Sequence, residues 1–263
     1  MKQNPFEIEF KFFSTKLYKD VLWVDFQKNL LIQSTSLENR DTLLAYLDKA
    51  AASGAVKTIV ICSSLEVSGH QAYMDFFKSI KSKQNNLGLQ RMTNAYAEFI
   101  LKIKELGKIV IHAARDNVIP LFLNLSLACD YRVAADNTIY KNSYLDSGVL
   151  PIGGGAYFLS RIIGPGKALE LMTLKREYTA EEAMAYGIID KIVPAANFQN
   201  EVIRVAHQFD EIPASTLMGL KRLIQFPVND LKSYLEYENQ EFFKIVQEHS
   251  YQHAVDPTAW TVL

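Results

Sequence analysis

The stretch KIVIHAARDNVIPLFLNLSLACDYRVAAD, residues 108–136, predicts a strand, a helix and a second strand in immediate succession. Its first seven residues form a short apolar run of the kind found in strands that are covered on both faces. Pro120 fits the first position of a helix, where a missing N–H costs nothing. The helix that follows is almost wholly apolar as far as Ala128, yet Asn124 stands in its middle. A helix built for burial needs a reason to carry an amide there.

Strands and helices are predicted to alternate on both sides of this stretch. Residues 6–13 and 21–27 alternate between apolar and polar and favour two paired strands, and residues 56–64 favour a buried strand. Thr35 with Glu38 is predicted to cap the helix between them. Further helices are expected near 71–83, in a segment that ends at about 106, and at 155–163 and 165–175. Strands are expected in YRVAAD, TIYKN and IIDKIVP. Thr179 and Glu182 predict a second capping box, and Gly187 is expected to end the helix that this box begins.

The alternation stops at about residue 195, and the rest of the chain has helical periodicity only. This pattern predicts an α/β core over residues 1–195 and an all-helical C-terminal region over 196–263. No Pro- or Gly-rich linker separates the two, so we expect them to pack tightly.

Composition narrows the class of protein. The 263 residues are 49% hydrophobic and 22% charged, with a formal net charge of −1, which favours a large core and argues against a nucleic-acid-binding surface. Cys62 and Cys129 lie in apolar runs and are predicted to be buried, reduced thiols. The N-terminal residues lack the apolar core of a signal peptide, and no run reaches 18 apolar residues. We therefore expect a cytoplasmic protein that does not enter a membrane.

A longer segment resembles a known family. Residues 147–194 read SGVLPIGGGAYFLSRIIGPGKALELMTLKREYTAEEAMAYGIIDKIVP. Together with the upstream ACD and RVAA, this segment resembles the enoyl-CoA hydratase/isomerase (crotonase) superfamily. The similar pieces are the G..P..GG turn, L.RIIG..KALELMT and AEEA...GI.D.IVP, which lie in one run of about 70 residues.

The resemblance implies a crotonase-like spiral of ββα units whose C-terminal helices pack into trimers or hexamers. It implies an acyl thioester as ligand, on CoA or on a carrier protein, with no cofactor beyond the CoA of the substrate. Two backbone N–H groups would form an oxyanion hole that stabilises an enolate. Matching the motifs places one donor on Ser68, in the turn SGHQA, and the other on Leu121, at the start of the helix that begins near residue 120.

The chain departs from the family pattern at the residues that carry the chemistry. The run of glycines at the second donor is replaced here by Pro120, Leu121 and Phe122. The two glutamates of family hydratases align with Asn124 and Tyr144. Addition of water needs two carboxylates across the double bond, and neither an amide nor an ordinary tyrosine accepts a proton at neutral pH. Standard hydratase activity is therefore not expected.

Three side chains remain as candidates for chemistry, each with a plainer alternative. Asn124 would position a water or a thioester carbonyl, or simply satisfy buried backbone groups. Tyr144 would donate a proton to an enolate, or only pack. Asp146 is the nearest carboxylate and a substitute base, or a solvated residue of the turn before Gly148.

Other residues favour structural roles. His70, His112 and Asp130 are interpreted as structural, and the glycines at 153–155 as a turn that opens a helix, because they lack the P-loop context. No cluster has metal-ligand spacing, so no metal is predicted. The segment QKNLLIQSTSL and the end HAVDPTAWTVL differ from the CoA-binding segments of the family, which weakens the expectation of CoA binding.

Two functional hypotheses follow. In the first, the protein is a divergent enzyme of lyase, isomerase, decarboxylase or hydrolase type that acts on an acyl thioester through an enolate. In the second, it is a non-catalytic homologue, a pseudoenzyme that keeps the fold as a binding or assembly partner. Bulky Leu121 and Phe122 at a glycine site favour the second hypothesis, and an intact backbone oxyanion hole would favour the first.

Overall fold

The computed structural model describes residues 5–26, 33–63, 71, 73–77, 86–226 and 230–248. The strands are β1 (Ile8–Glu9), β2 (Phe13–Tyr18), β3 (Val21–Phe26), β4 (Thr58–Ser63), β5 (Ile109–Ala114), β6 (Asn117–Val118), β7 (Tyr131–Ala135), β8 (Ile139–Lys141), β9 (Glu177–Thr179) and β10 (Lys191–Val193). The helices are α2 (Leu37–Ala52), α4 (Asn86–Glu105), α5 (Pro120–Ala128), α6 (Ser143–Ser147), α7 (Gly155–Ile163), α8 (Pro165–Leu174), α9 (Ala180–Ala185), α10 (Phe198–His207), α11 (Ala214–Gln225) and α12 (Leu231–Glu248).

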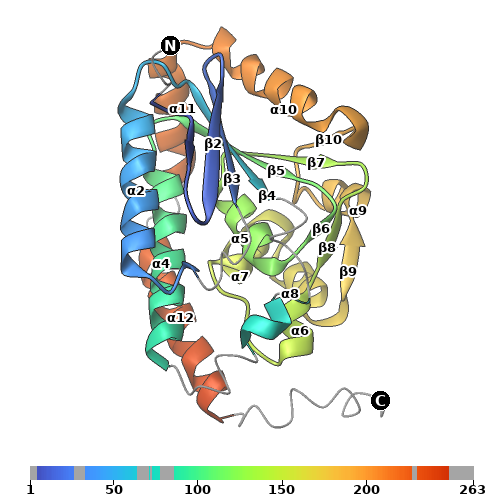
Figure 1. Ribbon diagram of the computed structural model, residues 1–263. Helices are drawn as coiled ribbons and strands as arrows, with labels where there is room; N and C mark the ends of the chain where they lie inside the picture. The colour runs from blue at the N-terminus through green and yellow to red at the C-terminus, as the bar shows by residue number, and fades with distance from the viewer. Residues whose placement is uncertain are drawn as a thin grey trace.

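The strands form a large and a small sheet (Figure 1). The order in the large sheet is β1-β2-β3-β4-β5-β7-β10, antiparallel from β1 to β3 and parallel from β3 to β10. The small sheet has the order β6-β8-β9. Strands β5 and β7 of the large sheet are each followed by a strand of the small sheet and then by a helix, α5 or α6. These are the ββα turns of the expected spiral.

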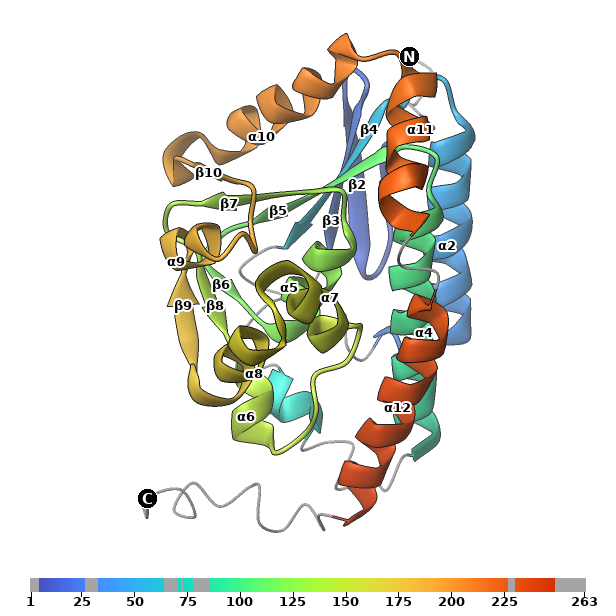
Figure 2. The ribbon, with the colours of Figure 1, turned by 180° about the vertical axis from the view of Figure 1, so that it is seen from behind.

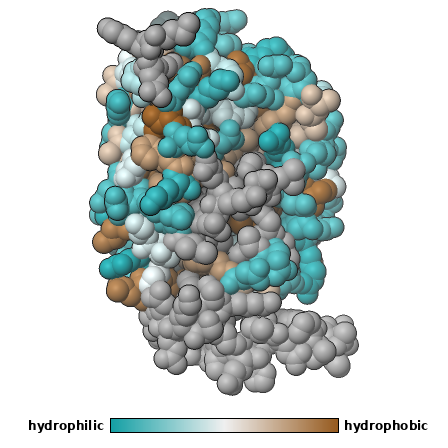
Figure 3. Space-filling view, viewed as in Figure 1, coloured by the Kyte–Doolittle hydropathy of each residue, from teal (hydrophilic) through white to brown (hydrophobic). Residues whose placement is uncertain are grey.

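The large sheet is buried on both faces because its strands alternate between two cores. Ile59 and Ile61 of β4 point into the larger core with helices α2, α4, α5 and α7, whereas Val60 and Cys62 point to the opposite side. Helix α10 covers that opposite side, and Val202 is among the residues it buries there (Figure 2). On the face seen in Figure 1, hydrophilic side chains cover most of the described surface, and hydrophobic ones form small separate groups (Figure 3).

Most of the predicted elements are confirmed, and two predictions near the N-terminus are wrong. The segment 6–13 is not the partner of strand β3; β2 pairs with β3 instead, in register from Phe13↔Phe26 to Tyr18↔Val21. Lys19, at φ 61°, makes the tight reversal between the two strands. The cap of α2 is Ser36, whose hydroxyl accepts from the N–H of Asn39, and not Thr35.

Later predictions hold in detail. The capping box of Thr179 and Glu182 is present at the start of α9, and Gly187 follows its end at φ 74°. Strand β9 and helix α6 had no clear sequence signal. Of the helix expected near 71–83, residues 73–77 are helical, and the remainder lies largely outside the described residues. Among the described helices, none is long and apolar enough to cross a membrane.

The packing of α10 generates a test of the second core. The ring of Phe198 lies edge-on to Trp23, with centroids 6.3 Å apart, and is 4% exposed. We expect Phe198→Ala to lower the free energy of unfolding by about 3–5 kcal/mol, because a large buried ring leaves a cavity. Asn200→Ala, on the exposed face of the same helix, is the control and should stay within about 0.5 kcal/mol. Urea unfolding followed by circular dichroism measures the free energy of unfolding of both variants. If the two substitutions lower it equally, the packing of Phe198 described here is contradicted.

Candidate functional site

The N-terminus of helix α5 is assembled from backbone groups alone. Ile119 is the N-cap in an extended conformation without a side-chain cap, and its carbonyl accepts from the N–H groups of Phe122, at 3.0 Å, and Leu123, at 3.1 Å. Pro120 occupies the first helical turn and has no N–H. Leu121 follows it, and an N–H in the first turn of a helix has no intrahelical acceptor. The Leu121 N–H is therefore the first backbone donor at this end of the helix.

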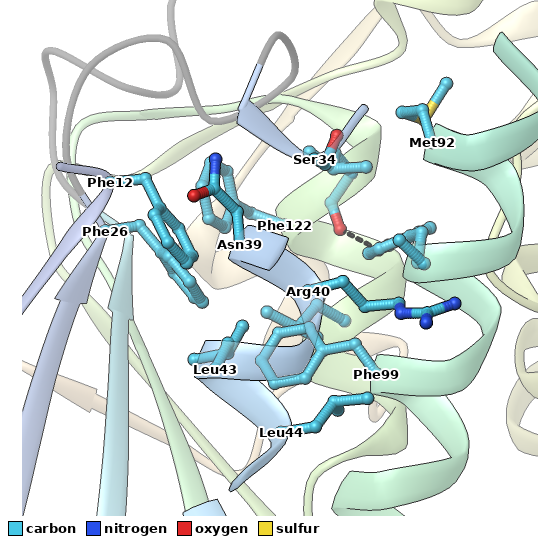
Figure 4. A pocket seen from close by; sticks show the side chains of 14 residues that line it. Phe12, Phe26, Ser34, Asn39, Arg40, Leu43, Leu44, Met92, Phe99 and Phe122 are labelled. Carbon is cyan, nitrogen blue, oxygen red and sulfur yellow. Dashed lines mark hydrogen bonds between the residues drawn. The ribbon is translucent and has the colours of Figure 1, made fainter. Parts of the chain in front are cut away.

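An apolar cavity of about 60 Å³ adjoins this helix end (Figure 4). Phe26 of β3 and Phe12, just before β2, border it on one side, and Leu43 and Leu44 border it from α2. Its other described lining residues are Ser34, Asn39, Arg40, Met92, Ala95, Tyr96, Phe99, Leu121, Phe122 and Leu125. None of these described residues carries a carboxylate, so the cavity offers apolar contact and no general base.

Tyr96 of α4 connects the cavity to a turn before α7. Its hydroxyl donates to the carbonyl of Leu121. Its ring lies against Gly153, where an added Cβ would overlap the ring carbon Cε1. Burial raises the pKa of Tyr96 well above its ordinary value, so the hydroxyl stays protonated and remains a donor.

Asn124 faces the same turn from helix α5. The side chain is 2% exposed, and its Nδ2 donates to the carbonyl of Ile152 at 2.7 Å. A Cβ on Gly155 would lie 2.5 Å from its Oδ1, so the glycine is what lets the amide approach. The structure thus supports the plainer alternative for Asn124, an amide that satisfies a buried backbone group.

Glu238 of α12 holds the turn from a third side. Glu238 is 6% exposed, and its Oε2 accepts hydrogen bonds from the N–H of Gly153 at 2.6 Å and from the N–H of Gly154 at 3.0 Å. Burial is the largest influence on this carboxyl and raises its pKa to about 7, while the two backbone N–H groups act in the opposite direction. It is a buried carboxylate that the motifs did not indicate.

Tyr144 and Asp146 are engaged away from the cavity. The Tyr144 hydroxyl donates to the carbonyl of Met172 at 2.7 Å, and burial raises its pKa above its ordinary value. Asp146 forms an ion pair with Arg176, and both side chains are at the surface. Neither residue is among those that line the cavity. Tyr144 instead borders a separate cleft of about 470 Å³ that it shares with Glu238.

The remaining candidates divide into described and undescribed residues. Ser68, the other predicted oxyanion donor, and His70 lie outside the described residues. His112 is 1% exposed, and burial lowers its pKa to about 3, so it is neutral at ordinary pH. Asp130 accepts from the N–H of Val110 at 2.8 Å and from the ammonium of Lys221 at 2.7 Å, which is a structural arrangement.

The two cysteines are both buried, and they form no disulfide with each other. Burial raises the pKa of the Cys129 thiol to about 12, and that of Cys62 well above its ordinary value, so neither is a thiolate near neutral pH.

One group of side chains among the described residues has donor atoms close enough for a cation. Ligand atoms of Asp20, His207 and Asp210 lie within 4.8 Å of one another. The Lys57 ammonium lies 3.2 Å from Asp20 and 3.8 Å from Asp210, and it supplies positive charge there. The group is explained as an ion-pair cluster that joins the β2–β3 turn to the end of α10.

Comparison with known proteins identifies the family. The sequence profile of the enoyl-CoA hydratase/isomerase family matches residues 18–258. The chain belongs to this family. Among curated relatives, it is 30% identical over 120 residues to a 4-chlorobenzoyl coenzyme A dehalogenase of Arthrobacter sp, which is 45% of this chain and 43% of that protein. It is 35% identical over 99 residues to a probable enoyl-CoA hydratase of Mycobacterium bovis, 38% of each chain. These matches span less than half of either relative.

Solved structures of the family share the fold along nearly the whole chain. An enoyl-CoA hydratase from Bacillus halodurans superposes with a TM-score of 0.80 at 20% identity, covering 93% of this chain and 98% of that one. An enoyl-CoA hydratase/isomerase from Pseudoalteromonas atlantica gives a TM-score of 0.72 at 17% identity, covering 93% of this chain and 95% of that one. At these identities the likeness shows the crotonase fold and no more.

Glu238 and Tyr96 were missed by sequence reasoning, although one signal could have pointed to Glu238. Leu231, Leu235 and Phe242 are buried on α12, and position 238 falls on the same helical stripe. A glutamate on a buried stripe requires a partner. Nothing in the sequence said that the partner would be the glycine turn.

The contact between Asn124 and Gly155 generates a prediction for this family member. Gly155 has no positive φ, and the three atoms nearest to a Cβ added there all belong to Asn124, so the collision with Asn124 is the strain that Gly155→Ala introduces first. We expect it to destabilise the protein by about 1–3 kcal/mol. Gly166→Ala in α8, where nothing lies within 4 Å, should be neutral or stabilising by up to about 1 kcal/mol.

A double variant isolates the cause. Asn124→Ala with Gly155→Ala should cost less than the sum of the two single changes, because the collision disappears with the amide. Thermal unfolding midpoints of the four proteins complete the cycle. Strict additivity would show that the two side chains do not meet.

Proposed function

We propose that this protein binds an acyl thioester, on CoA or on a carrier protein, with the thioester carbonyl at the N-terminus of helix α5. The observation that carries the proposal is the backbone donor of Leu121 beside an apolar cavity of about 60 Å³. A helix N-terminus favours developing negative charge, and the adjoining cavity would take the acyl chain. Ser68 is proposed as the second donor.

The chemistry that fits such a site is stabilisation of an oxyanion, either the enolate left by a decarboxylation or the tetrahedral intermediate of a thioester hydrolysis, and not addition of water to a double bond. Hydration needs a base and an acid across the double bond. Asn124 is committed to the Ile152 carbonyl, and Tyr144, kept protonated by its raised pKa, cannot act as a base near neutral pH. A stabilised enolate needs only backbone donors and a weak acid. Tyr144 would supply that proton if it exchanged the Met172 carbonyl for substrate, while Asp146 would need to leave Arg176 to act as a base.

The relatives support the class of substrate. The names of the dehalogenase and of the probable hydratase both specify a CoA thioester, although they denote different reactions. The two relatives therefore share the class of ligand, a CoA thioester, and not the reaction. We propose that no cofactor is needed beyond the CoA of the substrate, and that the chain forms a trimer or hexamer. Exposed Leu223, Ile224 and Phe226 on and after α11 support assembly, because such a patch favours contact with another subunit.

The size of the cavity predicts a short acyl chain. A cavity of about 150 Å³ holds one benzene molecule, so a cavity of less than half that size suits only a few carbons. By calorimetric titration, we expect butyryl-CoA to bind most tightly, acetyl-CoA less tightly and octanoyl-CoA more weakly than acetyl-CoA. Free CoA should also bind more weakly than acetyl-CoA. Each buried CH₂ adds at most about 0.8 kcal/mol until the space is filled. Affinity that rises steadily to octanoyl-CoA would contradict the cavity as acyl site, and no preference for thioesters over CoA would contradict the oxyanion hole.

A second candidate function is a non-catalytic binding or assembly partner. Phe122 favours it: the side chain is 1% exposed, packs near Phe26 with ring centroids 6.1 Å apart, and narrows the space at the glycine position of the family. The non-catalytic function is also favoured by the contacts of Tyr144 with the Met172 carbonyl and of Asp146 with Arg176, because neither side chain faces the cavity.

Turnover of malonyl-CoA to acetyl-CoA and CO₂ separates the two functions. If the protein is a decarboxylase with Tyr144 as proton donor, Tyr144→Phe should lower kcat by about 100-fold with little change in KM. Tyr178→Phe is the matched control, since Tyr178 is also buried and its hydroxyl has no partner among the described residues. Equal turnover by wild type and Tyr144→Phe would remove Tyr144 from the mechanism. Absence of turnover in a protein that binds acetyl-CoA would favour the non-catalytic function.

A further inference from the structure

The turn at residues 152–155 is held by three helices that are far apart in the sequence. Helix α12 supplies the Glu238 carboxylate, which accepts from Gly153 and Gly154. Helix α5 supplies Asn124, which donates to the carbonyl of Ile152. Helix α4 supplies the ring of Tyr96, which fills the space that a side chain on Gly153 would need. Three independent side chains thus converge on four residues of backbone.

Two of these three side chains also belong to the candidate site. Asn124 lies one helical turn from Leu121, and Tyr96 donates to the Leu121 carbonyl while lining the apolar cavity. Glu238 is not itself among the residues that line the cavity. Its hydrogen bonds to Gly153 and Gly154 connect it to the site through the turn, and its charge also acts on the hydroxyl of Tyr96. The backbone N–H groups it binds would otherwise be buried donors without an acceptor, so loss of the carboxylate would release the turn.

We propose that Glu238 is a positioning residue: it fixes the turn at residues 152–155, and through the turn it sets the side chains of Asn124 and Tyr96 that flank the N-terminus of helix α5. The inference rests on the proposed function in one respect only, which is that this helix end binds the thioester carbonyl. Its mechanical part, which is the effect of Glu238 on the turn and on the side chains of Asn124 and Tyr96, concerns the protein without ligand.

The carboxylate makes this positioning dependent on pH. Among the described residues, the groups that face Glu238 are Tyr96 from α4 and Tyr234 from its own helix, whose hydroxyls stay protonated because burial raises their pKa values. Tyr144 and Glu241 border the cleft on its other side, and Glu241 forms an ion pair with Lys244. Because the pKa of Glu238 is raised to about 7, the charged acceptor is present above that pH and is lost as the pH falls through it.

Nuclear magnetic resonance of protein labelled with ¹⁵N-glycine and ¹⁵N-asparagine tests the mechanical part without ligand. We expect the side-chain amide signals of Asn124 to move between pH 8 and pH 5.5, with a midpoint near 7. Glu238→Gln should abolish this titration, and Glu238→Ala should displace the Asn124 signals at every pH. Glu236→Gln, an exposed glutamate of the same helix, is the control and should behave as wild type.

One outcome would overturn the proposal directly. If the Gly153 and Gly154 signals respond to Glu238→Gln but those of Asn124 do not, Glu238 is a local support of the turn and positions nothing. The glutamine variant carries this test even if the alanine variant does not fold, because it keeps the shape of the side chain and one acceptor oxygen.

Titration with acetyl-CoA at pH 8 tests the link to the site. We expect Glu238→Gln to weaken binding about fivefold, as is usual for residues that act through others, with Glu236→Gln unchanged. If wild type and Glu238→Gln bind acetyl-CoA equally tightly although the Asn124 signals are displaced, the turn does not affect binding at the site, and the inference is overturned. If wild type does not bind acetyl-CoA, the proposed function fails instead, and the resonance measurement still decides whether Glu238 positions Asn124.

Discussion

Helix α5 has no face toward solvent: each of its residues from Pro120 to Ala128 is buried. The polar side chains and carbonyls of this helix therefore need partners inside the protein, since an unpaired buried group costs about 1–3 kcal/mol. Its partners explain much of the architecture around it. Asn124 binds the carbonyl of Ile152, Ser126 donates to the carbonyl of Leu123 at 2.6 Å, and Tyr96 donates to the carbonyl of Leu121. The glycines at 153–155 and the carboxylate of Glu238 follow from the same requirement, because they make room for these contacts and satisfy the turn.

The fold could be predicted from the sequence wherever the signal is local or periodic. Strands β4 and β5 are short apolar runs, and α9 carries its own capping box, so their positions were predicted closely. Strand β2 was misplaced because residues 6–18 contain apolar residues throughout, and only the reversal at Lys19 selects the true register. The ββα spiral itself came from the resemblance, because pairing between β5, β7 and β10 joins segments that are far apart in sequence.

The start of helix α5 could be predicted from the sequence, and the side-chain contacts around it could not. Pro120 marked that start, whereas the donor was assigned to Leu121 by matching the ACD motif at residues 128–130 to the family. The partners of Tyr144, Asp146 and Asn124 could not be predicted, because Met172, Arg176 and Ile152 lie 28–30 residues further on along the chain. Glu238 reaches Gly153 across 85 residues, and such a contact has no signature in local sequence.

These contacts bear on which part of the family's chemistry survives divergence. A general acid or base depends on one side chain, and at the two positions where the resemblance aligns a glutamate this chain has Asn124 and Tyr144, both of which donate to backbone carbonyls. A backbone donor depends on where a helix begins, and that is set by Pro120 and by the burial of α5. A backbone donor at this position, which we propose as part of an oxyanion hole, can therefore persist while the side chains around it change. The side chains that flank this helix end are a separate matter: by our proposal Asn124 and Tyr96 are positioned by the turn at residues 152–155, which Glu238 holds from 85 residues further along the chain.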